Sequence, residues 1–327
     1  MKSTDPDELF ELSRRFMASR VLLSGFELGV FTALGHGPRT SAQVAATVKA
    51  DARATDRLLD ALVVLGLLRK SAGRFSNGPA AARRLVAGRP GYMAGLGHSA
   101  SLWRTWSTLT ESVRQGRGVL KEPVGRRGAA WFASFIAAMH ERARQTADGV
   151  VSRLDLRGVS RVLDVGGGSG AYAMACARAK PGLRATVFDL PQTAVLTRGY
   201  IRKAGLSSRV DVRVGDYEKD ALPRGHDLAL LSAIIHSCSP AGTLRLFRKC
   251  ARALNPGGRI VVQEFVVDES RTAPAFAVYF ALNMLVGTQA GDAYTESEIS
   301  SWMRQAGFGG IRRQDTPFET ALITGRL

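Results

Sequence analysis

The sequence predicts an α/β protein whose C-terminal half forms a doubly wound parallel sheet and whose N-terminal half is helical. Two observations indicate the sheet. Short apolar runs alternate with helical stretches from Val159 onward, and the run Arg161–Val165 opens directly into the glycine-rich turn Gly166–Gly170. Almost continuous helical periodicity before residue 157 indicates the helical half. Because alternating strands and helices build parallel sheets, we expect two domains of different class.

The C-terminal half, residues 158–327, carries the signals of individual strands and helices. Capping boxes mark helix starts, as in Thr295-Glu296-Ser297-Glu298, and Asn255-Pro256-Gly257-Gly258 is typical of a turn. The expected strands are Arg161–Val165, Ala185–Asp189, Val210–Val214, Leu228–Ser232, Ile260–Val267 and Thr320–Thr324. The expected helices are Ala171–Ala179, Thr193–Ala204, Ala241–Leu254 and Thr295–Ala306.

The first 95 residues have the order of a winged-helix domain. The expected helices are Phe16–Leu34, a short one after the capping box at Thr40, and Asp56–Leu68; a hairpin turning at Gly73 follows. This order invites a DNA-binding interpretation. The third helix is strongly apolar in its second half, however, which favours a packed face over one lying in a DNA groove.

Residues 96–157 predict linking helices between the two domains. We expect a helix over Ser101–Val113, a Gly- and Arg-rich loop over 116–128, and one long helix over Trp131–Leu154. On the long helix, Trp131, Phe135 and Met139 share one face. Such a stripe belongs to a core or forms the wall of a pocket for an aromatic molecule.

Composition excludes several classes of protein. The net charge is +17, but the basic residues are scattered, which favours a solvated basic surface over a nucleic-acid site. The chain has three cysteines, an odd number without CxxC spacing, which predicts no disulfide framework and no metal site. The chain shows no membrane-length apolar run and starts with acidic and polar residues, without a signal-peptide core. We therefore expect a cytoplasmic protein with no membrane association.

Chemistry-bearing residues follow the predicted strands, at the edge where ligands of doubly wound sheets bind. The glycine turn follows the first strand, and Asp189 ends the second, at the spacing of a ribose-binding acid in a Rossmann-like unit. Asp216 and Tyr217 follow the third strand, the segment from Ser232 to His236 follows the fourth, and Glu264 lies within the fifth.

The glycine pattern argues against a dinucleotide. The turn reads G-G-G-S-G rather than G-x-G-x-x-G, so NAD fits it poorly. Asp164, two residues before the first glycine of the turn, would repel a pyrophosphate but would suit a cationic ligand. S-adenosylmethionine carries an ammonium and a sulfonium and no phosphate, and it is the cofactor that we expect.

Four segments together resemble one family over nearly the whole chain. They are Leu163-Asp164-Val165-Gly166-Gly167-Gly168-Ser169-Gly170, Phe188-Asp189-Leu190-Pro191, Gly215-Asp216 and Pro256-Gly257-Gly258. This set is similar to the S-adenosylmethionine-dependent O-methyltransferases of small aromatic molecules, such as the caffeic acid, hydroxyindole and polyketide O-methyltransferases. The resemblance implies a class I methyltransferase domain, preceded by a winged-helix-like domain that forms a homodimer.

The resemblance also implies roles for residues on the cofactor side. Gly166 and Gly168 would pass close to the methionine part of the cofactor, with Asp164 below them. Asp189, with Leu190 beside it, would accept hydrogen bonds from the ribose. Asp216 and Tyr217 would flank the adenine, and Ser232 stands where many plant members have a lysine.

On the acceptor side, the resemblance implies that His236 is the general base and Glu264 its orienting acid. A neutral imidazole suits a phenolic proton. The chain departs from the family at Ser237-Cys238, where Asp-Trp is usual, and at Ala293, where a second orienting acid is common and only Asp292 stands nearby. The implied acceptor-binding residues are Phe135, Met139, Arg142, Met284 and Thr288.

These departures leave alternatives open. The same fold could methylate carbon or nitrogen, or run another cofactor-assisted reaction. An RNA methyltransferase would need a basic stripe near His236 or Asp292, which the sequence does not show. A winged-helix regulator that senses a metabolite would need basic residues on the third helix, where Arg53 and Arg57 are the candidates.

Overall fold

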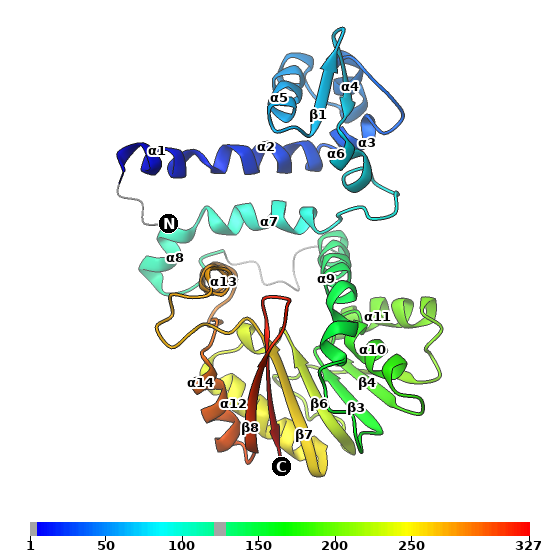
Figure 1. The fold of residues 1–327 in the computed structure, drawn as a ribbon, viewed down its shortest axis with the longest axis vertical. Coiled ribbons are helices and arrows are strands. Elements are labelled where there is room, and N and C mark those ends of the chain that lie inside the picture. The colour runs from blue at the N-terminus through cyan, green and yellow to red at the C-terminus, as the bar shows by residue number, and fades with distance from the viewer. Residues whose placement is uncertain (1–4, 121–128) are drawn as a thin grey trace. The chain divides into compact units, whose positions relative to one another are not determined.

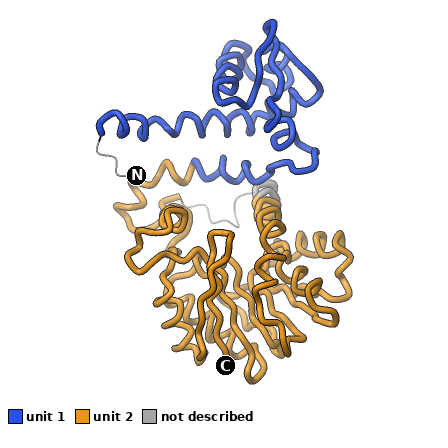
Figure 2. Tube along the Cα trace, in the orientation of Figure 1, with its two compact units in different colours: residues 1–103 blue, residues 104–327 orange. Residues whose placement is uncertain are grey.

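The computed structural model describes residues 5–120 and 129–327, and it divides into two compact units. Unit 1 ends at Trp103 and unit 2 runs from Arg104 to Leu327, so the boundary falls within helix α7, Leu96–Trp106 (Figure 2). The expected loop over 116–128 lies partly outside the described residues, because 121–128 are not among them.

Unit 1 is a helical domain with one hairpin. The expected helix over Phe16–Leu34 was wrong in its extent, because Gly29 adopts a left-handed backbone (φ +74°) and separates α2 from α3. The Thr40 capping box is present. The helices are α1 (Pro6–Arg14), α2 (Phe16–Glu27), α3 (Val30–Ala33), α4 (Ser41–Val48), α5 (Ala52–Val64) and α6 (Pro79–Arg84).

The third helix of the winged-helix order, α5, starts and ends earlier than expected. The Asp51 side chain caps it by accepting a hydrogen bond from the Ala54 amide. Leu68, expected in the helix, instead begins the hairpin strand β1 (Leu68–Ser71), which pairs with β2 (Arg74–Asn77). Leu59 and Leu62 of α5 are fully buried in the unit's core, whereas Val64 at the end of the helix is exposed, so one face of its apolar half packs into the core.

The expected helix over Ser101–Val113 is two helices, α7 and α8 (Leu109–Gln115). Within unit 1, α7 lies beside α2 (Figure 1), where the Arg20 guanidinium stacks on the Trp103 ring at 5.6 Å. This cation–π contact gives the Trp103 ring a partner within the unit.

Unit 2 contains a mostly parallel sheet with the strand order β5-β4-β3-β6-β7-β9-β8 among the described residues. The expectation of a wholly parallel sheet was wrong at one edge, because β9 pairs antiparallel with both β7 and β8. The sequence also missed β8. The strands are β3 (Arg161–Val165), β4 (Arg184–Asp189), β5 (Val210–Val214), β6 (His226–Ser232), β7 (Leu254–Glu264), β8 (Gly309–Asp315) and β9 (Ala321–Arg326).

Helices cover both faces of this sheet (Figure 1), as a doubly wound architecture requires. One core lies between the sheet and α9–α11, and a second lies between the sheet and α12 and α14. The sequence did not predict α13. The helices are α9 (Ala129–Val151), α10 (Ala171–Ala179), α11 (Pro191–Lys203), α12 (Pro240–Ala253), α13 (Ala275–Gly287) and α14 (Glu296–Gln305).

Three negative findings concern the described residues. None of their helices is long and apolar enough to cross a membrane. They contain no cluster of metal-ligating side chains, and Cys176, Cys238 and Cys250 are all free and buried.

Candidate active site

The glycine turn adopts backbone conformations that other residues rarely reach. Gly166, Gly168 and Gly170 all have positive φ (+64°, +56° and +75°). A Cβ on Gly166 would collide with the Ile234 side chain, whereas a Cβ on Gly168 would point into open space. The turn therefore leaves partly exposed backbone at Gly168 beside open space, where a ligand can approach closely.

Asp164 lies below this turn, fully buried at the end of β3. One carboxylate oxygen accepts a hydrogen bond from the Ala173 amide at 3.2 Å, and the other has no hydrogen-bond partner within the described part of the chain. Burial, with a smaller contribution from the nearby charge of Asp189, raises the pKa of Asp164 to about 7. A buried, unsatisfied carboxylate oxygen suits a cationic ligand.

Asp189 closes the same turn from the end of β4. Its carboxylate accepts hydrogen bonds from the backbone amides of Gly168 (2.8 Å) and Leu190 (2.7 Å). Burial raises its pKa despite these bonds. Each carboxylate oxygen has lone pairs left, so Asp189 can also accept hydrogen bonds from hydroxyl groups.

The predicted adenine-binding residues follow β5. Asp216 pairs with Lys219 at 2.9 Å and accepts a hydrogen bond from the Glu218 amide. Burial alone would raise the pKa of Asp216, but these partners bring it below its usual value. Ser232, at the end of β6, donates its hydroxyl hydrogen to the Gln263 side chain at 2.8 Å.

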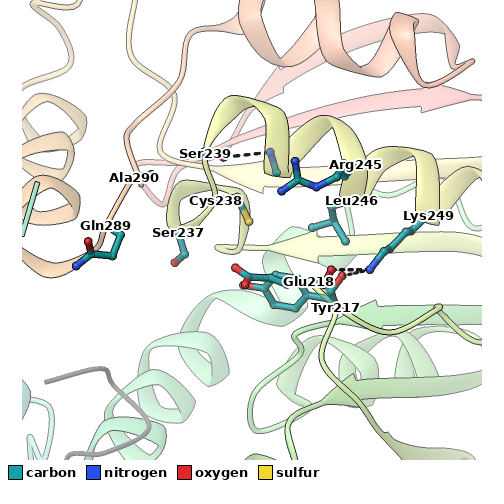
Figure 3. Close-up of a pocket in the computed structure, with 11 residues that line it drawn as sticks. Tyr217, Glu218, Ser237, Cys238, Ser239, Arg245, Leu246, Lys249, Gln289 and Ala290 are labelled. Carbon is teal, nitrogen blue, oxygen red and sulfur yellow. Dashed lines mark hydrogen bonds between the residues drawn. The ribbon is translucent and has the colours of Figure 1, made fainter. Parts of the chain in front are cut away.

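A cavity of about 270 Å³ borders Tyr217. Figure 3 shows its wall formed by the Tyr217–Glu218 loop, the segment from Ser237 to the start of α12, and Gln289–Ala290. The Lys249 ammonium donates hydrogen bonds to the carbonyls of Tyr217, Glu218 and Asp220, which holds this loop against α12. Burial raises the pKa of the Tyr217 hydroxyl, so it stays neutral.

His236 and Glu264 form a close pair between the ends of β6 and β7. The His236 Nδ1 atom lies 2.9 Å from Glu264 Oε2 and 3.1 Å from Oε1. The Glu264 side chain is 4% exposed, and that of His236 is 14% exposed. The Phe280 ring packs on the imidazole in a T-shaped arrangement, with 4.9 Å between centroids. The ring is therefore held from two directions while part of it stays accessible.

Asp292 does not take the place of a second orienting acid. Its backbone amide donates a hydrogen bond to the His236 carbonyl at 3.0 Å, but its carboxylate contacts Arg271 and the Ala293 amide. Burial raises the pKa of Asp292. Among the described residues, the carboxylate that contacts the imidazole is that of Glu264.

The predicted acceptor-binding residues of unit 2 lie on α9 and α13, with Thr288 directly after the end of α13. Phe135, Met139 and Arg142 share the side of α9 that the helical spacing predicts, and the first two are partly buried. On α13, Met284 is buried, and the Thr288 hydroxyl bonds to the Met284 carbonyl at 2.7 Å. The Arg142 guanidinium lies over the rings of Phe265 and Phe276. The side chain of Trp131 lies outside the described residues.

One contact at the glycine turn escaped the sequence analysis. His140 Nδ1 lies 2.8 Å from the Ser169 hydroxyl, and the imidazole stacks on Tyr200 at 3.9 Å. Burial and the cations Arg144 and Lys203 lower the pKa of His140. Its position next to Met139 in the sequence could have suggested a place near the site. Sequence alone, however, does not show that α9 reaches the glycine turn.

Comparisons with known proteins agree with this geometry. The model of an O-methyltransferase domain matches residues 106–309, and that of an O-methyltransferase dimerisation domain matches residues 10–87. The chain belongs to the O-methyltransferase family. The family resemblance and the expected fold are both confirmed.

The similar proteins include enzymes of small-molecule metabolism. A 3-hydroxy-5-methyl-1-naphthoate 3-O-methyltransferase of Streptomyces sahachiroi is 33% identical, over 98% of this chain and 95% of its own length. The tetracenomycin polyketide 8-O-methyltransferase TcmO of Streptomyces glaucescens is 31% identical, over 98% and 96%. Human N-acetylserotonin methyltransferase in complex with S-adenosylmethionine superimposes with a TM-score of 0.85 at 29% identity, over 100% and 99%.

This O-methyltransferase uses S-adenosylmethionine, as the sequence predicted. The residues at the glycine turn fit that cofactor. The free oxygen of buried Asp164 suits a cationic group, the open backbone at Gly168 admits a ligand, and Asp189 retains acceptor capacity. S-adenosylmethionine supplies the methyl group on a positively charged sulfur.

Proposed function

We propose that this methyltransferase moves the methyl group of S-adenosylmethionine to a hydroxyl of a small aromatic, polyketide-like molecule, with His236 as general base. The contact between His236 Nδ1 and Glu264 carries the proposal. A buried carboxylate accepts the hydrogen of Nδ1, which leaves the lone pair on Nε2. Nε2 is then the atom that takes the proton of the acceptor hydroxyl.

The reaction is an in-line displacement. The acceptor oxygen forms a bond to the methyl carbon while the carbon–sulfur bond breaks, and the sulfur leaves as a neutral thioether. The hydroxyl proton passes to Nε2, and Glu264 stabilises the resulting imidazolium. Phe280 limits rotation of the ring, so the base keeps its direction.

The named relatives favour an aromatic hydroxyl over a carbon or nitrogen acceptor. One acts at the 3-hydroxyl of a naphthoate, and another is an 8-O-methyltransferase of polyketide synthesis. Phe135, Met139, Met284 and Thr288 are the proposed contacts of the ring system, since aromatic and thioether side chains pack well on flat rings. Residues 96–157 would thus contribute to the acceptor site, and residues 158–327 would bind the cofactor.

On the cofactor side, the proposed contacts follow the strand ends. Asp189 and Leu190 would bind the ribose, Asp216 and Tyr217 the adenine, and the glycine turn with Asp164 the methionine part. Ser232 would line the cofactor site, although its hydroxyl is engaged by Gln263.

We also propose a homodimer formed through the N-terminal domain, consistent with the matching dimerisation model. The winged-helix regulator gains little support from α5, because Arg57, one of its two candidate arginines, lies within 4 Å of both Asp56 and Asp60. Carboxylates this close to Arg57 lower the positive potential that a polyanion would meet on this helix.

The test is methylation of a panel of phenols by the wild-type protein and by His236→Gln, with products identified by mass spectrometry. We expect O-methylated products, and a loss of kcat of about a thousandfold in the variant with a phenol of ordinary acidity. With an acidic nitrophenol, which is already ionised at neutral pH, the loss should be far smaller. The exposed His36→Gln is the matched control.

Cofactor binding by His236→Gln should stay within about twofold of wild type in a calorimetric titration. Equal losses with ordinary and acidic phenols would contradict a role as base. Methyl groups on carbon or nitrogen would overturn the proposed acceptor atom.

A further inference from the structure

Arg142 sits on a cluster of aromatic rings rather than in an ion-pair network. Its guanidinium carbon lies 4.9 Å from the centroid of Phe265 and 5.4 Å from that of Phe276. Phe265, Phe276 and Phe280 contact one another, with centroids 4.6 to 6.1 Å apart. We call these three rings the phenylalanine cluster. Two rings hold the flat guanidinium in place without using its N–H groups.

The N–H donors of the Arg142 guanidinium are largely unused. Its nearest carboxylate is Glu319 at 3.9 Å, the outer limit of an ion pair and too long for a hydrogen bond. Both side chains are about half exposed, so this contact is weak and screened. The guanidinium makes no hydrogen bond within the described part of the chain, although it is a donor in a rigid planar fork.

The phenylalanine cluster connects Arg142 to the base. Phe265 directly follows Glu264, and Phe280 contacts both Phe265 (4.6 Å) and His236 (4.9 Å). Imidazole and guanidinium therefore contact different rings of one aromatic cluster, His236 through Phe280 and Arg142 through Phe265 and Phe276. A flat acceptor packed against the partly exposed rings of Phe276 and Phe280 would then have its hydroxyl near His236 and an acidic group near Arg142.

We infer that Arg142 selects acceptors that carry a carboxylate on the aromatic ring, which rests on the proposed hydroxyl methylation at His236. A guanidinium binds a planar carboxylate through two parallel N–H···O bonds. The preformed stack on Phe265 and Phe276 reduces the conformational entropy lost when those bonds form. Glu319, half exposed and at long range, is readily displaced by an acid that binds with better geometry.

The experiment compares each hydroxyarene carboxylic acid, of one to three rings, with its neutral carboxamide. The measured quantity is the ratio of kcat/KM for acid over amide. We expect wild type to favour the acid by about tenfold or more, mainly through KM, and Arg142→Met to bring the ratio close to one. Arg142→Lys, which keeps the charge but lacks the fork, should give an intermediate ratio.

Arg144→Met is the matched control, because Arg144 is on the same helix but pairs with Glu141 at 3.0 Å. It should leave the ratio at the wild-type value. Binding of the same acids and amides to the protein loaded with S-adenosylhomocysteine provides a readout independent of turnover. Thermal melting shows whether Arg142→Met remains folded.

An acid-to-amide ratio near one in wild type, or one unchanged by Arg142→Met, would overturn the inference. Such a result leaves the hydroxyl methylation intact, because O-methylated products would still form from the amides. Failure of the proposed function has a different signature: no O-methylated product from either series. In that case, equal binding of acids and amides in the calorimetric arm would overturn the inference as well.

Discussion

The two halves of the sheet's ligand-binding edge use carboxylates in contrasting ways. At the ends of β3 and β4, backbone amides hold Asp164 and Asp189 against the glycine turn. At the ends of β6 and β7, Glu264 is held against the imidazole of His236. The cofactor half is therefore built from local backbone, and the acceptor half from side chains that tertiary packing brings together. This difference explains why the cofactor was easier to predict than the acceptor.

Ionisation of a buried carboxyl in the cofactor half should lower the stability of the folded protein. The pKa of Asp164 is raised to about 7, above the ordinary value of an unfolded Asp, so the folded state holds its proton more tightly. The free energy of unfolding should thus fall as pH rises from about 4 to 7. The Asp164→Asn variant has no ionisable group at this position. Its free energy of unfolding minus that of wild type should therefore increase by about 4 kcal/mol between pH 4 and 7.

Urea unfolding of the cofactor-free protein at several pH values measures this difference. Asp227→Asn is the control, because hydrogen bonds from Ser160, Asn255 and Arg161 lower the pKa of Asp227 to about 2 despite partial burial. That lies below the window, so its difference from wild type should not change between pH 4.5 and 8. A pH-independent difference for Asp164→Asn would remove the contrast between the two halves.

Substitutions in the acceptor half should lower kcat rather than weaken cofactor binding. Glu264→Gln removes the charge that stabilises the imidazolium, and we expect kcat to fall by about a hundredfold. Binding of S-adenosylhomocysteine should change by less than about twofold. Calorimetry and steady-state kinetics separate these two effects.

Glu298→Gln is the matched control. Glu298 forms an ion pair with Arg271 at 2.6 Å and does not contact the imidazole. Its kcat should match wild type. If Glu264→Gln instead weakened cofactor binding as strongly as it lowered kcat, the two halves would not be separable.

The opposite pattern is expected at Asp189. Asp189→Ala removes the acceptor proposed for the ribose hydroxyls and releases the Gly168 amide. We expect the Kd for S-adenosylhomocysteine to rise by about thirtyfold, the effect of a lost charge-assisted hydrogen bond. In a calorimetric titration, the exposed Asp211→Ala on β5 should bind like wild type. Unaltered affinity in Asp189→Ala would exclude the ribose role.

Local physics made much of the fold predictable. Alternating apolar runs predicted the parallel strands, and capping boxes at Thr40 and Thr295 marked helix starts to the residue. Segments whose state depends on distant partners were missed or misplaced. The edge strand β8 is almost wholly exposed and lacks an apolar pattern, and α13 is apolar on all sides, so neither shows the expected periodicity.

The sequence by itself determined the O-methyltransferase family, the cofactor and the glycine turn. These rest on short local motifs, and a turn with three positive-φ positions at Gly166, Gly168 and Gly170 strongly favours glycine. Only the tertiary structure decided which acid meets His236 and that Asp292 does not orient it. It also placed His140 against Ser169 and Arg142 over the phenylalanine cluster. Those contacts join residues on separate elements, and their distances depend on how helices and strands pack, which no local pattern records.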